Sequence, residues 1–136
     1  MRKIFCLLSL MFIAFSCSET SRNDMALRMA KEYYDSLFAG HASYFVKGTY
    51  LPDSIPAGYM EQLIANAKMF KARQDEEHQG AVEVRMVNCV TDTVVAPKGK
   101  EKVVTANAFL MLCYGDSLKE EIVVPMIEHK GRWLMR

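Results

Sequence analysis

The chain has 136 residues, of which 51% are hydrophobic and 24% are charged, and its formal net charge is +1 at pH 7. A chain of this length can bury one hydrophobic core but not two. Charged residues of both signs are interspersed along the sequence, which argues against a surface that steers a nucleic acid or another polyanion.

The first sixteen residues have the pattern of a secretion signal. Arg2 and Lys3 precede an apolar run from Ile4 to Phe15, and this order keeps the N-terminus in the cytoplasm while the run enters the bilayer. The run is too short to remain as a membrane span, which needs about 20 apolar residues. We therefore expect residues 1–16 to be removed, which leaves 15 basic against 16 acidic residues and a net charge of about −1.

Cys17 follows this signal. The segment Ala14-Phe15-Ser16-Cys17 resembles the lipobox of bacterial lipoproteins, in which a small residue precedes a cysteine that is diacylated and becomes the new N-terminus. The resemblance implies membrane attachment through lipid on Cys17, on the periplasmic side or at the cell surface of the bacterial envelope. Several acyl chains on one residue anchor a protein stably. The alternative is an ordinary cleaved signal with an incidental cysteine. Residues 17–23 are expected to form a short flexible tether.

Three helical segments are expected next. Apolar residues recur at helical spacing from Asp24 to Ala39, and Gly40 is placed to end that helix. His41 to Val46 would add one short helical turn. After a loop with two prolines, a third amphipathic pattern reaches about Glu77, and Gly80 closes it.

After Gly80 the hydrophobic period changes from 3.6 to 2, which indicates strands. The first strand is expected from about Val82, and a turn at Pro97 to Lys100 leads into the second. Further turns at 115–117 and 130–131 separate a third strand and a short fourth one. Four consecutive strands with short connections predict an antiparallel meander.

The remaining cysteines, Cys89 and Cys113, fall on two strands of one expected hairpin. The register places Cys89 opposite about Ala108 and Cys113 opposite about Val84, so the two sulfurs would be more than about 13 Å apart, too far for a disulfide. Both are expected to be small buried hydrophobic residues. The histidines are scattered singly and there is no C-x-x-C motif, so we expect neither a metal site nor a cofactor.

The order of these elements, with Leu37-Phe38-Ala39-Gly40 and Gly131-Arg132-Trp133-Leu134 as accompanying patterns, resembles the nuclear transport factor 2-like, or cystatin-like, α+β cone. More narrowly, the chain resembles small bacterial lipoproteins of uncharacterised function built on that fold. The resemblance covers about residues 24–136 and implies a single domain in which N-terminal helices pack on a curved four-stranded antiparallel meander. It does not fix the function, because this fold hosts isomerases, dehydratases, binding modules and assembly domains.

Such cones leave a pocket at the open end, and two polar residues of the first strand are candidates to line it. Asn88 and Asp92 interrupt the apolar even-numbered face and would point toward the helices. A carboxylate in an apolar mouth can have a raised pKa and act as a base, with Tyr34, Tyr44 or Tyr59 as its partner. This would suit an isomerase or dehydratase similar to ketosteroid isomerase. The alternative is that Asp92 lies beyond the core and that Asn88 marks a bulge or bonds to backbone.

A different feature favours binding rather than catalysis. The second and third strands are apolar on both faces, and the helices can cover only one of them, whereas an exposed antiparallel sheet normally carries polar residues. We expect the uncovered face to pack against a second copy, forming a homodimer, or against another protein. Its candidate contact residues are Val103, Phe109, Met111, Cys113, Val123 and Ile127. The favoured function is a non-enzymatic envelope lipoprotein that binds a protein partner or a small ligand, and the isomerase or dehydratase is the alternative.

Overall fold

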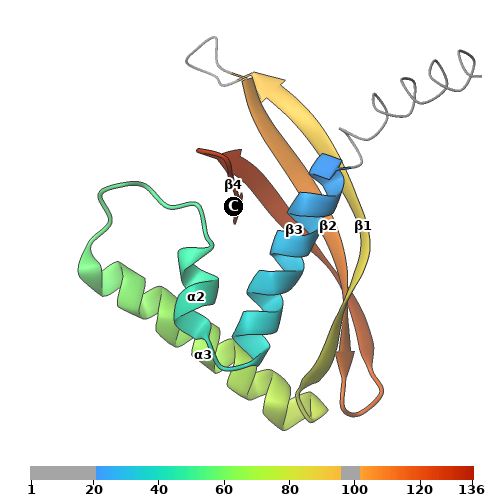
Figure 1. Ribbon diagram of the computed structural model, residues 1–136. Coiled ribbons are helices and arrows are strands. Elements are labelled where there is room, and N and C mark those ends of the chain that lie inside the picture. The colour runs from blue at the N-terminus through green and yellow to red at the C-terminus, as the bar shows by residue number, and fades with distance from the viewer. Residues whose placement is uncertain (1–20, 96–101) are drawn as a thin grey trace, which may run out of the picture.

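The computed structural model describes residues 21–95 and 102–136, and it has helices first and a sheet second (Figure 1). Residues 21–38 form a helix, here called helix 21–38, which is followed by α2 (Ala42–Lys47) and α3 (Ala57–His78). The strands are β1 (Ala81–Val95), β2 (Lys102–Tyr114), β3 (Lys119–His129) and β4 (Arg132–Met135). They form one sheet in the order β1-β2-β3-β4, and each neighbouring pair is antiparallel. The α+β class and the meander are confirmed.

Several expectations fall outside the described residues. These are the signal at 1–16, the lipidation site at Cys17 and the turn at Pro97 to Lys100. The end of the expected tether is described and differs from the prediction, because residues 21–23 are already helical. Within the described ranges, no helix combines the length and the apolar character that a membrane crossing requires.

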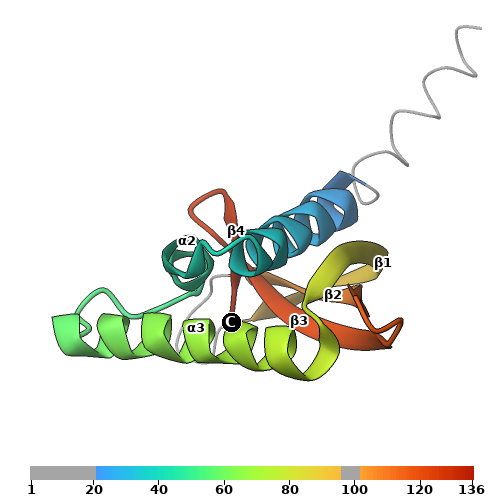
Figure 2. The same cartoon turned by 90° about the horizontal axis from the view of Figure 1, so that it is seen from below.

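Helix 21–38 covers the inner face of the sheet (Figures 1 and 2). Its buried side chains recur every three or four residues, and each is at most 1% exposed: Ala26, Ala30, Tyr33 and Leu37. The two alanines are small enough for the helix to approach the strands closely, and they belong to the main core together with residues of all four strands. The large strand side chains in this core include Leu110, Leu112, Tyr114, Met126 and Trp133.

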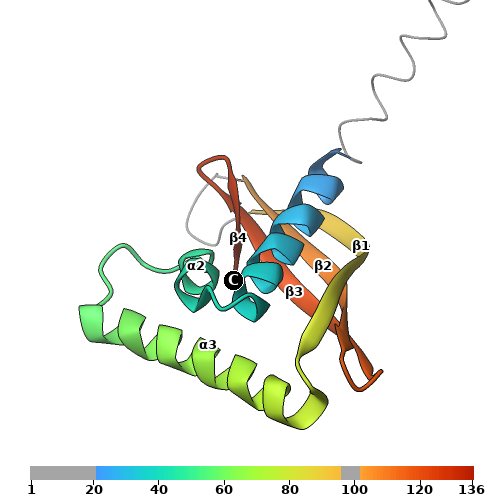
Figure 3. The same ribbon diagram turned by 60° about the horizontal axis from the view of Figure 1, so that its bottom comes forward.

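The other two helices form a small satellite cluster beside the main core, with the end of helix 21–38; it is here called the second core. Its buried members are Leu37, Ala42, Val46 and Ala67. Ala67 is the only buried residue of α3, and α3 approaches the sheet only at its C-terminal end, where the chain turns into β1 (Figures 1 and 3). The sheet is therefore covered mainly by helix 21–38. Both cores lie between residues 26 and 135. A chain that begins at residue 18 therefore contains every residue of both cores.

A bulge in β1 changes which side chains face the core. Val84 faces the buried side, but the register shifts directly after Met86, and Cys89 then lies on the buried side opposite Ala108. One extra residue in a strand reverses the alternation beyond it. The expectation that the even-numbered face points inward along the whole strand is therefore wrong past Met86, and Val90 is 54% exposed.

The edge of β4 is covered by the segment that follows α2. The backbone N–H of Met135 donates to the carbonyl of Gly48 at 2.7 Å, and the N–H of Tyr50 donates to the carbonyl of Met135 at 2.6 Å. Two residues earlier on β4, the buried Tyr33 hydroxyl donates to the Trp133 carbonyl at 2.7 Å. These bonds satisfy backbone groups that an uncovered edge would leave free.

Candidate functional site

The structure does not bring the expected acid and tyrosine together. Asn88 and Asp92 are exposed on the side of β1 that faces away from the helices, and an Asp92 oxygen accepts a hydrogen bond from the N–H of Thr93 at 2.8 Å. Tyr34 is half-buried on helix 21–38, where burial raises its pKa and its ring meets Phe45 edge-on at 5.2 Å. The reason for the difference is the bulge, as the alternative interpretation of Asn88 anticipated.

Tyr44, another of the tyrosines considered, does have an acidic partner. Its hydroxyl donates to the carboxylate of Glu32 at 2.9 Å, and this hydrogen bond is the main cause that raises the pKa of Tyr44. Both side chains are exposed. The pair lines a hollow between the helices rather than the inside of the cone.

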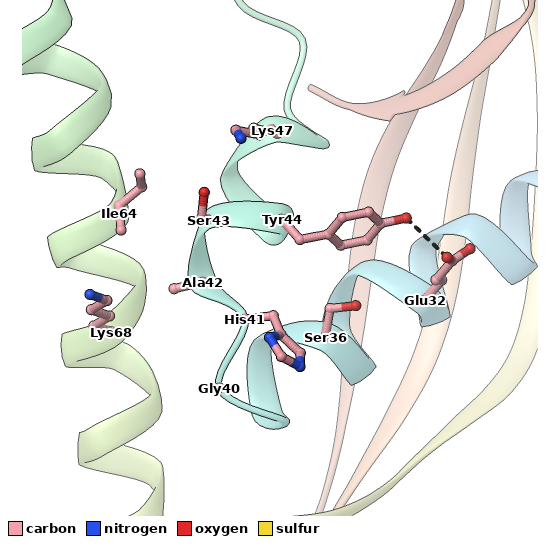
Figure 4. A pocket seen from close by; sticks show the side chains of 10 residues that line it. All are labelled: Glu32, Ser36, Gly40, His41, Ala42, Ser43, Tyr44, Lys47, Ile64 and Lys68. Atoms are coloured by element: carbon pink, nitrogen blue, oxygen red, sulfur yellow. Dashed lines mark hydrogen bonds between the residues drawn. The ribbon is translucent and has the colours of Figure 1, made fainter.

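This hollow is a cavity of about 690 Å³ formed by three helices, and we call it the helical cavity (Figure 4). Helix 21–38, α2 and α3 each contribute to its wall, and most of its polar side chains are exposed to solvent. The lining residues are Glu32, Ser36, Gly40, His41, Ala42, Ser43, Tyr44, Lys47, Ile64 and Lys68. Sequence reasoning missed this site because its side chains come from three separate segments and form no local motif.

The turn between the first two helices creates the cavity. Gly40 adopts a φ of +97°, a conformation that glycine accepts easily, and the N–H of His41 donates back to the carbonyl of Ser36 at 2.8 Å. The chain therefore reverses at once into α2, whose residues Ala42 and Val46 pack down onto the second core. This packing leaves Ser43, Tyr44 and Lys47 of α2 exposed to solvent.

The two described cysteines do not form a reactive site. Cys89 and Cys113 are free and buried, and they lie on opposite faces of the sheet. The register confirms Cys89 opposite Ala108, while Cys113 lies opposite Glu83. Burial raises the pKa of the Cys89 thiol, which disfavours the nucleophilic thiolate. In the ranges 21–95 and 102–136, no three His, Cys, Asp or Glu side chains are grouped so that they could hold a metal ion.

The second candidate surface is the side of the sheet that faces away from helix 21–38, here called the outer face. The expected contact residues share it, because they alternate along β2 and β3 and Phe109 lies directly opposite Val123. Val90 and Val94 of β1 extend this face, since the bulge turns them outward. Val90, Val94 and Val123 are about half exposed, at 54%, 47% and 52%, whereas Cys113 is only 6% exposed.

Polar residues interrupt the outer face at its centre and at one end. In the middle of β2 the exposed Asn107 lies between Val90 and Pro125. At the end near the β2–β3 turn, two neighbouring rows across the sheet carry the ionic side chains Glu83, Arg85, Lys119 and Glu121. Arg85 donates to Glu83 at 3.0 Å. The face is therefore less uniformly apolar than the sequence predicted, and the outward-facing Asn88 and Asp92 add polar groups to its β1 side.

Comparison with known proteins gives a structural neighbour but no sequence relative. No family model and no curated protein matches this sequence. The crystal structure of a Campylobacter jejuni protein, assigned provisionally as an NTF2-like transpeptidase, superimposes with a TM-score of 0.57. The alignment covers 79% of this chain and 94% of that chain, at 10% sequence identity. The fold is nuclear transport factor 2-like.

This result confirms the fold that the order of elements implied. An identity of 10% shows the fold alone, and nuclear transport factor 2-like folds carry both binding modules and enzymes. The two candidate sites on this chain are the helical cavity and the outer face.

Proposed function

We propose that this chain is a lipid-anchored, non-enzymatic binding module of the bacterial cell envelope. It associates with protein through the outer face, either as a homodimer or with a different partner. The observation that carries the proposal is the exposure of three valines on that face, Val90, Val94 and Val123. The alternative, an isomerase or dehydratase, is not favoured by a specific observation, because Asp92 and Tyr34 lie on opposite sides of the sheet.

The exposed valines supply a driving force for association. Val90, Val94 and Val123 are each about half exposed, and removing the remaining apolar surface of one such side chain from water contributes about 1 kcal/mol. The partly buried Phe109 and Met111 lie among them on the same face. An uncovered antiparallel face would more commonly carry polar side chains at these positions.

The attachment to the membrane is supported by the N-terminal sequence pattern. The helical residue 21 lies four residues after Cys17, and four residues span at most about 14 Å. The domain is accordingly held close to the bilayer, with the start of helix 21–38 nearest to it.

Metabolic labelling with a radioactive fatty acid tests the anchor. The wild-type chain is expected to incorporate the label and to fractionate with membranes, whereas a Cys17→Ala variant loses both properties. Label that persists in Cys17→Ala would remove the lipid anchor from the proposal.

Light scattering at micromolar concentration tests the outer face, using a chain that begins at residue 18. We expect a dimer for the wild-type chain and a monomer for Val123→Lys. Leu118→Lys is the matched control, since Leu118 is 43% exposed but lies in the β2–β3 turn. A wild-type monomer that binds an apolar dye, and loses this binding in Val123→Lys, indicates a different protein partner. A monomer that binds no dye contradicts the proposed role of the outer face.

A further inference from the structure

The helical cavity has a buried floor, and its walls carry both apolar and polar side chains. Its floor is the second core, where Ala42 of the lining is 4% exposed. Ile64 adds apolar surface on the α3 side, and the ring of Tyr44 extends from the other side of α2 toward Glu32 (Figure 4). A volume of about 690 Å³ lies within the range of small-molecule sites, about 300–1,000 Å³. The space is sufficient for an organic molecule with an apolar body.

Two cations face this space without a carboxylate partner. Lys47 projects from α2 and Lys68 from α3, on either side of the gap between these helices (Figure 4). Among residues 21–95 and 102–136, neither lysine forms an ion pair, whereas Lys31 and Lys71 pair with aspartates four residues away, at 2.5 and 2.6 Å. The two unpaired charges are therefore available to a ligand.

The only carboxylate of the lining is engaged elsewhere in the site. Glu32 accepts a hydrogen bond from the hydroxyl of Tyr44 at 2.9 Å. The side chains of Ser36, Ser43 and His41 add hydrogen-bonding groups around the same space. The balance of formal charge in the cavity is positive, with two lysines against one glutamate.

We propose that the helical cavity binds a small organic anion. The acidic group of the ligand lies between Lys47 and Lys68, and its apolar body lies against Ile64. This site is separate from the outer face and does not depend on dimerisation. It adds a ligand-binding role to a surface formed entirely by the helices.

Nuclear magnetic resonance titration of the chain from residue 18 tests this proposal with three probes. Benzoate carries an acidic group on an apolar ring, benzamide is its uncharged counterpart, and inorganic phosphate is an anion without the ring. We expect saturable shifts with benzoate at the backbone amides of residues 40–47 and around Lys68, with a dissociation constant on the order of 1 mM. Benzamide and phosphate are both expected to bind about tenfold more weakly. Equal affinity for benzamide would overturn the anion preference, and equal affinity for phosphate would overturn the role of the apolar wall.

Two double variants with the same change of net charge separate a local site from general electrostatic attraction. Lys47→Gln with Lys68→Gln should weaken benzoate binding about tenfold. Lys31→Gln with Lys71→Gln removes two ion-paired lysines from helix 21–38 and α3 and should leave the affinity nearly unchanged. Equal losses in the two variants, or no saturable shift in the wild-type chain, would refute the site. Because all four lysines are at least partly exposed, the dispersed spectrum of the folded chain should persist in both variants.

Discussion

Replacing Gly48 by alanine should destabilise the fold through a single steric contact. Gly48 is buried directly after α2 and has a φ of −79°, which any residue can adopt. Backbone strain therefore plays no part. A Cβ at this position would lie 2.5 Å from Cδ1 and 2.7 Å from Cζ of Tyr33, and it would also overlap Cε1. Carbon atoms in ordinary contact are about 3.5–4.0 Å apart.

The Tyr33 ring cannot move away at low cost. It is 1% exposed in the main core, and its hydroxyl donates to the Trp133 carbonyl at 2.7 Å. Overpacking a well-filled core costs about 1–3 kcal/mol, and breaking a buried hydrogen bond adds about 1 kcal/mol. We expect Gly48→Ala to lower the free energy of unfolding by about 2–4 kcal/mol, a large part of the roughly 5–15 kcal/mol of a typical domain.

Urea denaturation followed by circular dichroism measures this loss, and a double-mutant cycle assigns its cause. In a Tyr33→Leu background the ring is gone, so adding Gly48→Ala should change stability by less than about 1 kcal/mol. Gly58→Ala is the control, because a Cβ at Gly58 meets nothing within 4 Å and alanine favours the helix by about 0.5–1 kcal/mol. An equal cost for Gly48→Ala in both backgrounds, or no cost at all, would refute this reasoning.

Two further predictions concern the contact between the end of α3 and the β2–β3 hairpin. Burial, together with the Glu120 carboxylate at 3.2 Å, raises the pKa of Tyr114 to about 12. The protonated Tyr114 hydroxyl therefore stabilises the folded chain below about pH 10. This contribution to the free energy of unfolding, about 2 kcal/mol, is lost as the pH rises through about 12. Urea midpoints at pH 9–12 should fall less steeply for Tyr114→Phe, and parallel curves would contradict this. Hydrogen bonds from His78 at 2.9 Å and from the Leu118 N–H at 3.0 Å lower the pKa of Asp116. The stabilisation from Asp116 is present above about pH 4 and is lost as the pH falls through the lowered pKa. Melting temperatures measured from pH 6 to pH 2 should decline more for the wild-type chain than for Asp116→Asn, and an identical decline would exclude this role.

The sequence was sufficient for the class of fold and the order of its elements. Hydrophobic period separates helices from strands wherever one face is buried, as on helix 21–38, and Gly40 and Gly80 both adopt the positive φ expected at a helix end. The absence of a disulfide between Cys89 and Cys113 also followed from simple register arithmetic. Hydrophobic periodicity and the offset between two residues along a hairpin can both be counted directly in the sequence.

The candidate catalytic group could not be placed in the same way. The prediction for Asn88 and Asp92 assumed uninterrupted alternation, and one extra residue after Met86 reversed it. The sequence carries a sign of this, because apolar Val87 follows Met86 directly and polar Asn88 then stands where the alternation calls for an apolar residue. That sign is compatible both with a bulge and with an inward-facing polar residue, so only strand pairing decides between them. Which side chains face inward is decided by pairing with β2. Ala108 is buried on the side of helix 21–38, and Cys89, which is directly opposite it in the register, faces the same side.

By itself, the sequence determined the α+β class, the helix-then-strand order and the residues of β2 and β3 that share the outer face. Only the tertiary structure decided that α3 leaves most of the sheet uncovered and that Lys47 and Lys68 lie at one cavity. The first set depends on interactions between neighbours along the chain. The second depends on how the second core fixes three helices relative to one another, and that packing is set by contacts between residues far apart in sequence.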